Sequence, residues 1–122
     1  MGKWVAGDVL DAALQTLAPA AAMIAMAGQP VDFAAAMSGR LAEAAMAPPD
    51  FSLGAGAGDG RRIGVATKSG VAVTADGVAD HIALVDTGGE RLLYVTTCPP
   101  RPLAAGGSVS FDAWHVEIGA PA

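Results

Sequence analysis

The sequence predicts an α+β fold: an antiparallel β-meander or sandwich with one N-terminal helix and one short second helix. Residues 60–98 are short β-prone runs separated by Lys-Ser-Gly, Ala-Asp-Gly and Thr-Gly-Gly-Glu. Glycine supplies the positive φ of tight turns, and Asp before Gly is a strong hairpin signal. At 122 residues the chain is expected to form a single domain. In that domain the helix-containing residues 1–50 pack on the antiparallel β part, residues 51–122.

The first helix is expected over residues 8–18. Asp8 follows a glycine and is a natural N-cap, and Pro19 ends the helical run. The apolar residues that recur at helical spacing are Val9, Leu10, Ala13, Leu14 and Leu17. Because Trp4 and Val5 directly precede this run, we expect them to pack where the helix begins.

Two alanine-rich runs fit either a helix or a strand. Residues 20–27 contain Ala and Met, which favour a helix, but the flanking Pro19 and Gly28 leave room for only a short element. Residues 41–47 alternate along their length and are followed directly by two prolines. A short buried strand therefore fits the first run better, and a strand is favoured for the second.

A short second helix is expected between those runs, over residues 31–38. Pro30 lies near its first turn, where the missing N–H costs nothing. Asp32 is early in the helix, and Gly39 follows its end.

The meander is expected to contain about four antiparallel strands, over residues 62–67, 70–74, 78–86 and 91–98. The last two are apolar on both faces, so we expect both of their faces to be covered. In 70–74, Val71 and Val73 alternate with small or polar residues, which is typical of a one-sided or edge strand.

Less regular segments surround these strands. Residues 54–60 are almost all Gly and Ala and are expected to form a mobile surface loop. Pro-Pro-Arg-Pro after Cys98 is expected to be an extended connector, since prolines donate no ladder hydrogen bonds.

The last strand is expected over residues 108–118, and its apolar pattern changes phase. The residues of the first phase are Val109 and Phe111, and those of the second are Trp114, Val116 and Ile118. This change predicts either a β-bulge near Asp112-Ala113 or a strand whose two halves serve different layers.

Composition excludes several classes of function. The net charge of −5 argues against a nucleic-acid partner, which needs a clustered positive surface. The most apolar window, Leu17 to Gly28, is about a dozen residues, against the roughly 20 that cross a bilayer. No membrane association is expected, and the protein is expected to fold in the cytoplasm. Cys98 is the single cysteine, so no internal disulfide framework is expected.

No arrangement of residues predicts catalysis, a cofactor or a metal. The Gly-rich run lacks the Lys-Ser/Thr end of a phosphate-binding loop. Asp80 and Asp86 are expected on the strand face opposite His81, so no acid–base dyad is expected there. His115 has no second ligand at metal spacing, and Cys98 has no nearby base. We therefore expect a protein that is not an enzyme.

The order of motifs resembles small structural proteins encoded among the virion genes of tailed bacteriophages and prophages, of the capsid decoration or cement kind. The motifs are Lys3-Trp4-Val5-Ala6, Val9 to Leu14, Gln29-Pro30, Asp50-Phe51, Lys68-Ser69-Gly70-Val71, His81 to Asp86, Leu92 to Cys98, Ala113-Trp114 and Val116-Glu117-Ile118. The resemblance runs nearly end to end and implies a non-enzymatic protein of the virion, assembled in the host cytoplasm.

The resemblance leaves three roles open. The first is a decoration protein that braces the major capsid protein as a homo-oligomer. The second is a neck, tail or fibre-associated structural protein, and the third is a small host-surface or carbohydrate-binding module. The residues expected at an interface are Trp4, Val5, Val71, Val73, Phe111 and Trp114. Exposed strand edges near 70–74 or 108–112 are expected to pair with a neighbouring chain.

Overall fold

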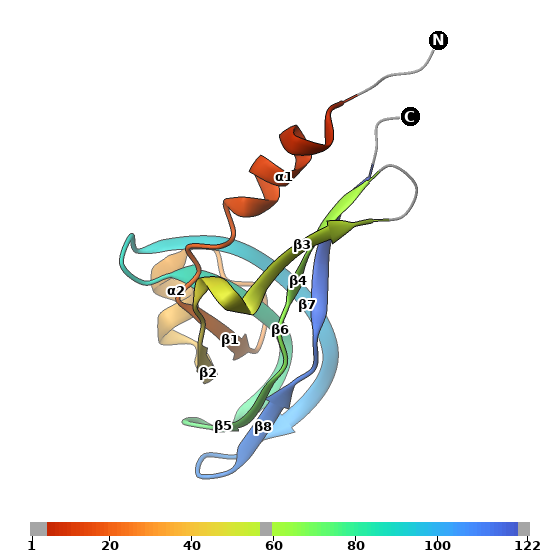
Figure 1. Ribbon diagram of the computed structural model, residues 1–122. Coiled ribbons are helices and arrows are strands. Elements are labelled where there is room, and N and C mark those ends of the chain that lie inside the picture. Colours follow the sequence, from red (N-terminus) through yellow and green to blue (C-terminus); the bar gives the residue numbers. More distant parts are fainter. Residues whose placement is uncertain (1–4, 57–59, 120–122) are drawn as a thin grey trace.

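The computed structural model describes residues 5–56 and 60–119. Its fold is the predicted α+β class, with three antiparallel sheets, an N-terminal helix α1 (Gly7–Gln15) and a short second helix α2 (Phe33–Ser38). In Figure 1, α1 extends away from the body of the strands, and α2 lies against the sheet that contains β1.

The largest sheet has the strand order β2-β1-β6-β7. Its strands are β1 (Ala22–Met26), β2 (Arg40–Ala45), β6 (Gly77–Asp86) and β7 (Arg91–Leu103). All five residues of β1 are buried, because the strand has a neighbour on each side and a packed layer on each face. This burial settles the ambiguous alanine-rich run as the buried strand that was favoured.

One face of this sheet packs against α2. The buried residues of that layer are Ala22, Ile24, Met26, Ala36, Ala83 and Val85, with Phe33, Met37, Leu92 and Val95 packed against them. The opposite face contributes Met23, Ala25 and Leu84 to the main core, together with side chains from the other sheets. Both predicted central strands are thus covered on both faces.

The second layer consists of two short sheets. β3 (Phe51–Ala55), β4 (Arg61–Val65) and β9 (Trp114–Ile118) form one, and β5 (Lys68–Ala72) and β8 (Ser108–Phe111) form the other. β4 and β5 follow one another along the chain, as do β8 and β9, and the first sheet takes β4 and β9 while the second takes β5 and β8. Val65 pairs with Trp114 and Lys68 pairs with Phe111, so the register is the same on both sides of the interruption.

The expected bulge at Asp112-Ala113 is therefore wrong. The extra residue lies on the partner strand, between Lys68 and Val71, where Gly70 has φ +64°. For Val116 and Ile118 the phase change has the other predicted cause, a strand whose two halves serve different layers, whereas Trp114 packs against the main core. Val109 and Phe111 pack in the main core, whereas Val116 and Ile118 pack in a separate cluster under α1 with Leu14, Leu17 and Ile63.

The strands curve into an incompletely closed barrel. β5 contacts β2 through an Ala42–Val73 bridge and a hydrogen bond from Thr74 N to Leu41 O of 2.8 Å. The order around the barrel is then β7-β6-β1-β2-β5-β8, and it is open between β7 and β8. Of the four strands expected to pair in succession, only β6 and β7 are neighbours. Residues 70–74 lie between β8 and β2 and do not form an exposed edge.

The helices begin and end near the expected positions, and Gly39 ends α2 as predicted, but the predicted N-cap Asp8 of the first helix is wrong. α1 starts after Ala6, with Asp8 in its first turn, and a turn replaces the expected last residues 16–18. Asp32 caps α2: its carboxylate accepts a hydrogen bond from Ala35 N at 2.8 Å, and Gly39 is the C-cap. The predicted packing of Trp4 lies outside the described residues.

Two strands differ from the prediction: β3 was not predicted as a strand, and β7 is longer than the predicted strand over residues 91–98. β3 includes Gly54 and Ala55, which were assigned to a loop whose residues 57–59 lie outside the described part of the chain. β7 continues through the prolines to Leu103. Pro102 pairs with Val78. Because pairs in an antiparallel ladder alternate between bonded and non-bonded, Pro102 occupies a non-bonded position and its ring nitrogen faces away from β6.

Candidate functional site

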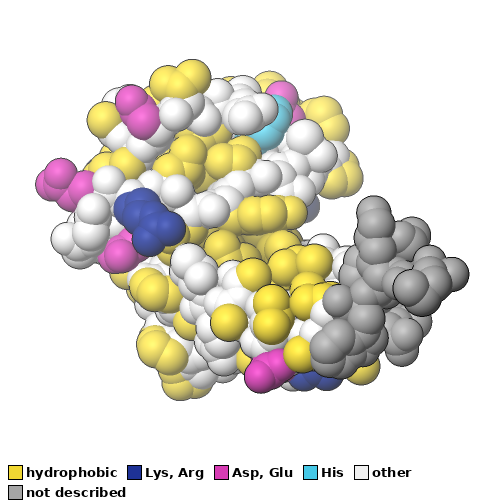
Figure 2. All heavy atoms as spheres, turned by 90° about the horizontal axis from the view of Figure 1, so that it is seen from above, with side chains coloured by type: hydrophobic (Ala, Val, Ile, Leu, Met, Phe, Trp, Pro, Cys, Tyr) yellow, Lys and Arg dark blue, Asp and Glu magenta, His cyan; other side chains and the backbone are white. Residues whose placement is uncertain are grey.

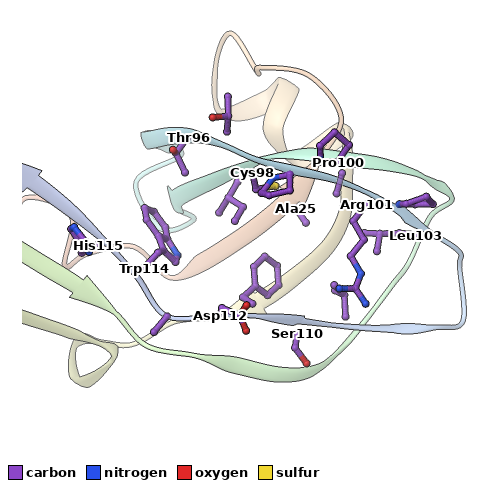
Figure 3. A pocket seen from close by; sticks show the side chains of 18 residues that line it. Ala25, Thr96, Cys98, Pro100, Arg101, Leu103, Ser110, Asp112, Trp114 and His115 are labelled. Carbon is purple, nitrogen blue, oxygen red and sulfur yellow. The ribbon is translucent and has the colours of Figure 1, made fainter.

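The opening between β7 and β8–β9 forms a groove of about 700 Å³ (Figure 3). Its walls are the second half of β7, Thr96 to Leu103, and the facing segment Val109 to His115. Apolar side chains dominate the lining: Ala25, Ala79, Ile82, Pro99, Pro100, Pro102, Leu103, Val109, Phe111, Ala113 and Trp114. Figure 2 shows a hollow lined by apolar side chains across one face, with most acidic side chains toward the periphery.

Trp114 is held in place at one end of the groove. It is half-buried, its indole Nε1 donates to Met23 Sδ at 3.4 Å, and its ring stacks on Tyr94 with a centroid distance of 6.0 Å. Two contacts from different strands fix the ring, so Trp114 presents a rigid apolar surface to the groove. Phe111, at 5% exposure, packs in the core beside it.

Charged groups lie at the margins of the groove. Arg101 extends from β7 toward β8, and Asp112 lies on the opposite wall (Figure 3). Neither forms an ion pair with another described residue. His115 Nε2 is 3.7 Å from Glu117 Oε1 on its own strand. These side chains are exposed and do not converge on a single point, so they do not form an assembled acid–base group.

Cys98 lies in the groove wall and is half-buried. Burial raises the pKa of the Cys98 thiol, and the negative charge of Asp80 raises it further. A raised pKa keeps the sulfur protonated near neutral pH, where the thiolate is the reactive form. Both effects favour the low reactivity that was predicted for this thiol.

The expectation that Asp80 and His81 could not meet is wrong. His81 Nδ1 lies 2.7 Å from Asp80 Oδ1. The contact lies beside an irregularity in the β6–β7 ladder, where the two steps from Ala79 to His81 on β6 face four steps from Arg101 to Thr97 on β7.

Asp80 also ties two segments together. Its Oδ1 accepts a hydrogen bond from Gly28 N at 2.8 Å, which joins the loop after β1 to β6. The hydrogen bonds from His81 and Gly28 stabilise the carboxylate and lower the pKa of Asp80. This arrangement is a loop anchor. Asp86, on the same strand, accepts a hydrogen bond from Gly89 N at 3.1 Å in the following turn.

The groove and the Asp80–His81 pair do not combine into a larger site. Neither Asp80 nor His81 lines the groove, although Cys98 and His115 do. Within residues 5–56 and 60–119 no three His, Cys, Asp or Glu side chains are placed to hold a metal ion.

The residues expected at an interface lie in different environments. Val73 and Phe111 are buried in the main core, and Val71 packs partly buried against it. Val5 and Trp114 are half-buried, and Trp4 lies outside the described residues. Of this set, the groove brings together Phe111 and Trp114.

The groove wall opposite Trp114 was not predicted from the sequence. Pro99, Pro100 and Pro102 were interpreted as part of a connector. No local sequence signal shows that this segment faces β8 and β9 across the opening of the barrel. Among the described residues, three large apolar side chains are exposed, and their exposure was not predicted either: Val9 at 57%, Val31 at 88% and Val78 at 47%.

Comparison with known proteins gives no match: no family model matches the chain, and neither a curated protein nor a solved structure does. Across the described residues, no helix has the length and apolar character needed to span a membrane.

Proposed function

We propose that this chain is a non-enzymatic structural protein of tailed-bacteriophage particles, specifically a capsid decoration protein that braces major-capsid subunits as an oligomer. The observation that carries the proposal is the open, apolar groove between β7 and β8–β9, which offers contact surface and no assembled catalytic group. The motif order from Lys3 to Ile118, which resembles such virion proteins, is the second support.

The binding mechanism is burial of apolar surface on a rigid support. The groove walls belong to strands tied into the main core, and Trp114 is fixed by Met23 and Tyr94, so little side-chain freedom is lost on binding. Each Å² of apolar surface removed from water contributes about 25 cal/mol. A particle repeats the same contact by symmetry, so modest individual contacts sum to stable attachment.

The direct test is the location and copy number of the chain in purified particles. Decoration of the shell requires on the order of hundreds of copies, whereas a neck or tail position gives about six or twelve. Cryo-electron microscopy of the particle locates the chain, and quantitative mass spectrometry against the major capsid protein counts it. Absence from the particle would reject the proposal, and a low count would place the protein at the neck or tail.

Variants of the groove test the binding surface itself. Ser110→Arg and Ala113→Arg place bulky charges at exposed groove positions and should lower particle occupancy at least about tenfold. Thr87→Arg adds the same charge at an exposed turn outside the groove and is the matched control. Equal occupancy of the three variants would show that the groove is not the contact.

A second candidate function, a host-surface or carbohydrate-binding module, is favoured by one observation: the indole of Trp114 lines an open groove. Aromatic rings that stack on apolar faces are a common basis of such recognition. A glycan-binding array distinguishes the two functions. Binding that is lost in Trp114→Ala and kept in Ser69→Ala, an exposed substitution outside the groove, would support the module.

A further inference from the structure

We infer that the free edge of β3 is a self-association surface, which pairs antiparallel with β3 of a second copy of this chain about a two-fold axis at Leu53. The inference deepens the oligomeric part of the proposed function by naming its surface and its partner. Its experiment uses the isolated protein in solution, so it can fail while particle attachment stands, and the reverse.

The ladder between β3 and β4 identifies the backbone groups at this edge. Ala66 N donates to Asp50 O at 2.9 Å, and Gly56 N donates to Gly60 O at 2.9 Å, so the pairs at both ends of β3 are hydrogen-bonded pairs. Bonded pairs alternate along an antiparallel ladder. The N–H and C=O groups of Phe51, Leu53 and Ala55 therefore point away from β4.

No described element pairs with these outward groups. β3 ends the order β3-β4-β9, and no backbone hydrogen bond outside that ladder involves residues 51–55. The edge also lacks the usual protection against strand pairing, because the sequence Phe-Ser-Leu-Gly-Ala contains neither proline nor charge. An uncapped strand edge of this kind is a template for another strand.

The sequence of β3 is complementary to itself in one register. With Leu53 opposite Leu53 of the second copy, Phe51 lies opposite Ala55 and Ser52 opposite Gly54, so only the central pair brings two large side chains together, and both are apolar. All the outward backbone groups then face one another and form about six hydrogen bonds. Phe51 and Leu53 are half-buried against the Leu14, Leu17 and Ile63 cluster, and pairing covers part of the surface that they still expose.

The self-complementary register points to a second copy as the occupant, and charge does not oppose that pairing at β3. The chain carries a net charge of −5, so two copies repel each other wherever acidic surfaces meet. β3 is a strand with no acidic residue, and its pairing brings no like charges into register. Twofold pairing of identical edges also closes on itself, which gives a dimer instead of a fibre.

The first experiment measures dimerisation by sedimentation velocity across a concentration series. Ala55→Pro removes one outward N–H per copy at an exposed position without breaking the β4 ladder, and should weaken the dimer at least about tenfold. Ala55→Thr keeps the N–H, favours strand structure and should leave the dimer as strong or stronger. Unchanged thermal unfolding of both monomers confirms that the fold is intact.

The second experiment tests the register with a disulfide. In a Cys98→Ser background, Leu53→Cys places two sulfurs across the axis, where the Cα atoms of a bonded pair are about 5.5 Å apart and a disulfide is allowed. Ser52→Cys places its pair about 8 Å apart, beyond that range. Rapid oxidation to a covalent dimer should therefore occur with Leu53→Cys and not with Ser52→Cys.

Three outcomes overturn the inference. A protein that stays monomeric at high concentration overturns the inference. A dimer whose dissociation constant is unchanged by Ala55→Pro overturns it as well. A monomer whose Ala55→Pro variant loses particle binding would show that the edge pairs with a virion protein and not with a second copy. Tenfold or greater weakening together with the Leu53→Cys crosslink supports the inference.

Discussion

β3 and the second half of β7 are both margins of sheets, but they present different chemistry to solvent. β7 carries prolines at positions 99, 100 and 102, together with Arg101, whereas β3 carries only small or apolar uncharged residues. Proline offers no N–H, and charge resists the approach of another strand, so the β7 margin is protected against pairing. The contrast separates two modes of contact: side chains in a groove beside β7, and backbone hydrogen bonds along β3.

The largest effect expected is on the fold that supports the groove. Phe111 is 5% exposed and packs between β8 and the main core, so Phe111→Ala should lower the free energy of unfolding by about 3–5 kcal/mol. Urea denaturation measures the change, and Ser110→Ala, exposed on the same strand, should change it by less than about 0.5 kcal/mol. Equal effects would mean that Phe111 is not part of a cooperative core. Dimerisation through β3 should persist in both variants.

The contrast between β3 and β7 can also be tested by removing the prolines that protect the β7 edge from pairing with another strand. Pro100→Thr combined with Pro102→Thr supplies N–H groups at this margin, and the N–H at 102 points outward. Self-association should rise about tenfold or more and extend beyond a dimer, since β7 then offers a further strand edge without its protecting prolines. Static light scattering measures the association. Pro49→Thr, in the short helical turn η1 (Pro48–Asp50) before β3, is the control and should not change it.

The class of fold could be predicted because its determinants are local. Helical spacing from Val9 to Leu17 and the glycine turns around the central strands each report on neighbours in the chain. Strand pairing could not be predicted in the same way. β4 pairs with β9 and β5 with β8, across more than 30 residues, and the closure of β2 on β5 rests on a single bridge. No periodicity in the sequence specifies those partners.

The candidate site could be predicted only in part, for the same reason. Phe111 was expected at a contact surface because an exposed strand edge was predicted over residues 108–112, and Trp114 because an indole can serve as a binding platform. The opposite wall depends on where Pro102 falls in the ladder, which is known only once Val78 is its partner. Likewise, the Asp80–His81 contact was not predicted, because strict alternation along a strand places the two side chains on opposite faces.

A smaller effect is expected where the chain enters β3. Asp50 Oδ2 accepts hydrogen bonds from Lys68 Nζ at 3.0 Å and from Ala47 N at 2.9 Å. These bonds, that of Lys68 first, lower the pKa of Asp50 from its ordinary value of 3.8. Asp50→Asn should therefore cost about 1 kcal/mol near neutral pH. Asp50→Glu, which keeps the charge but not the geometry, is the control and should recover part of the loss.

The pH dependence of that difference follows from the direction of the pKa change. A carboxylate with a lowered pKa in the folded state contributes its stability above the ordinary pKa and loses it as the pH falls through the lowered value. The gap between the native protein and Asp50→Asn should be full above about pH 5 and shrink steadily in more acidic solution. Urea denaturation at a series of pH values measures it. A gap that is constant with pH would show that the charge of Asp50 is not responsible.

The smallest effect is expected at the thiol in the β7 wall. The pKa of Cys98 is raised chiefly by burial and further by the charge of Asp80. Asp80→Asn removes that charge, so the thiolate fraction at a fixed pH should rise and alkylation by iodoacetamide should accelerate by no more than about threefold. Asp86→Asn, on the same strand but not among the causes of the raised pKa, is the control. Because burial dominates, both variants should still react more slowly than the unfolded chain. A variant that matches the unfolded chain would mean that the packing of β7 against β6, and with it the groove wall, depends on the Asp80 anchor.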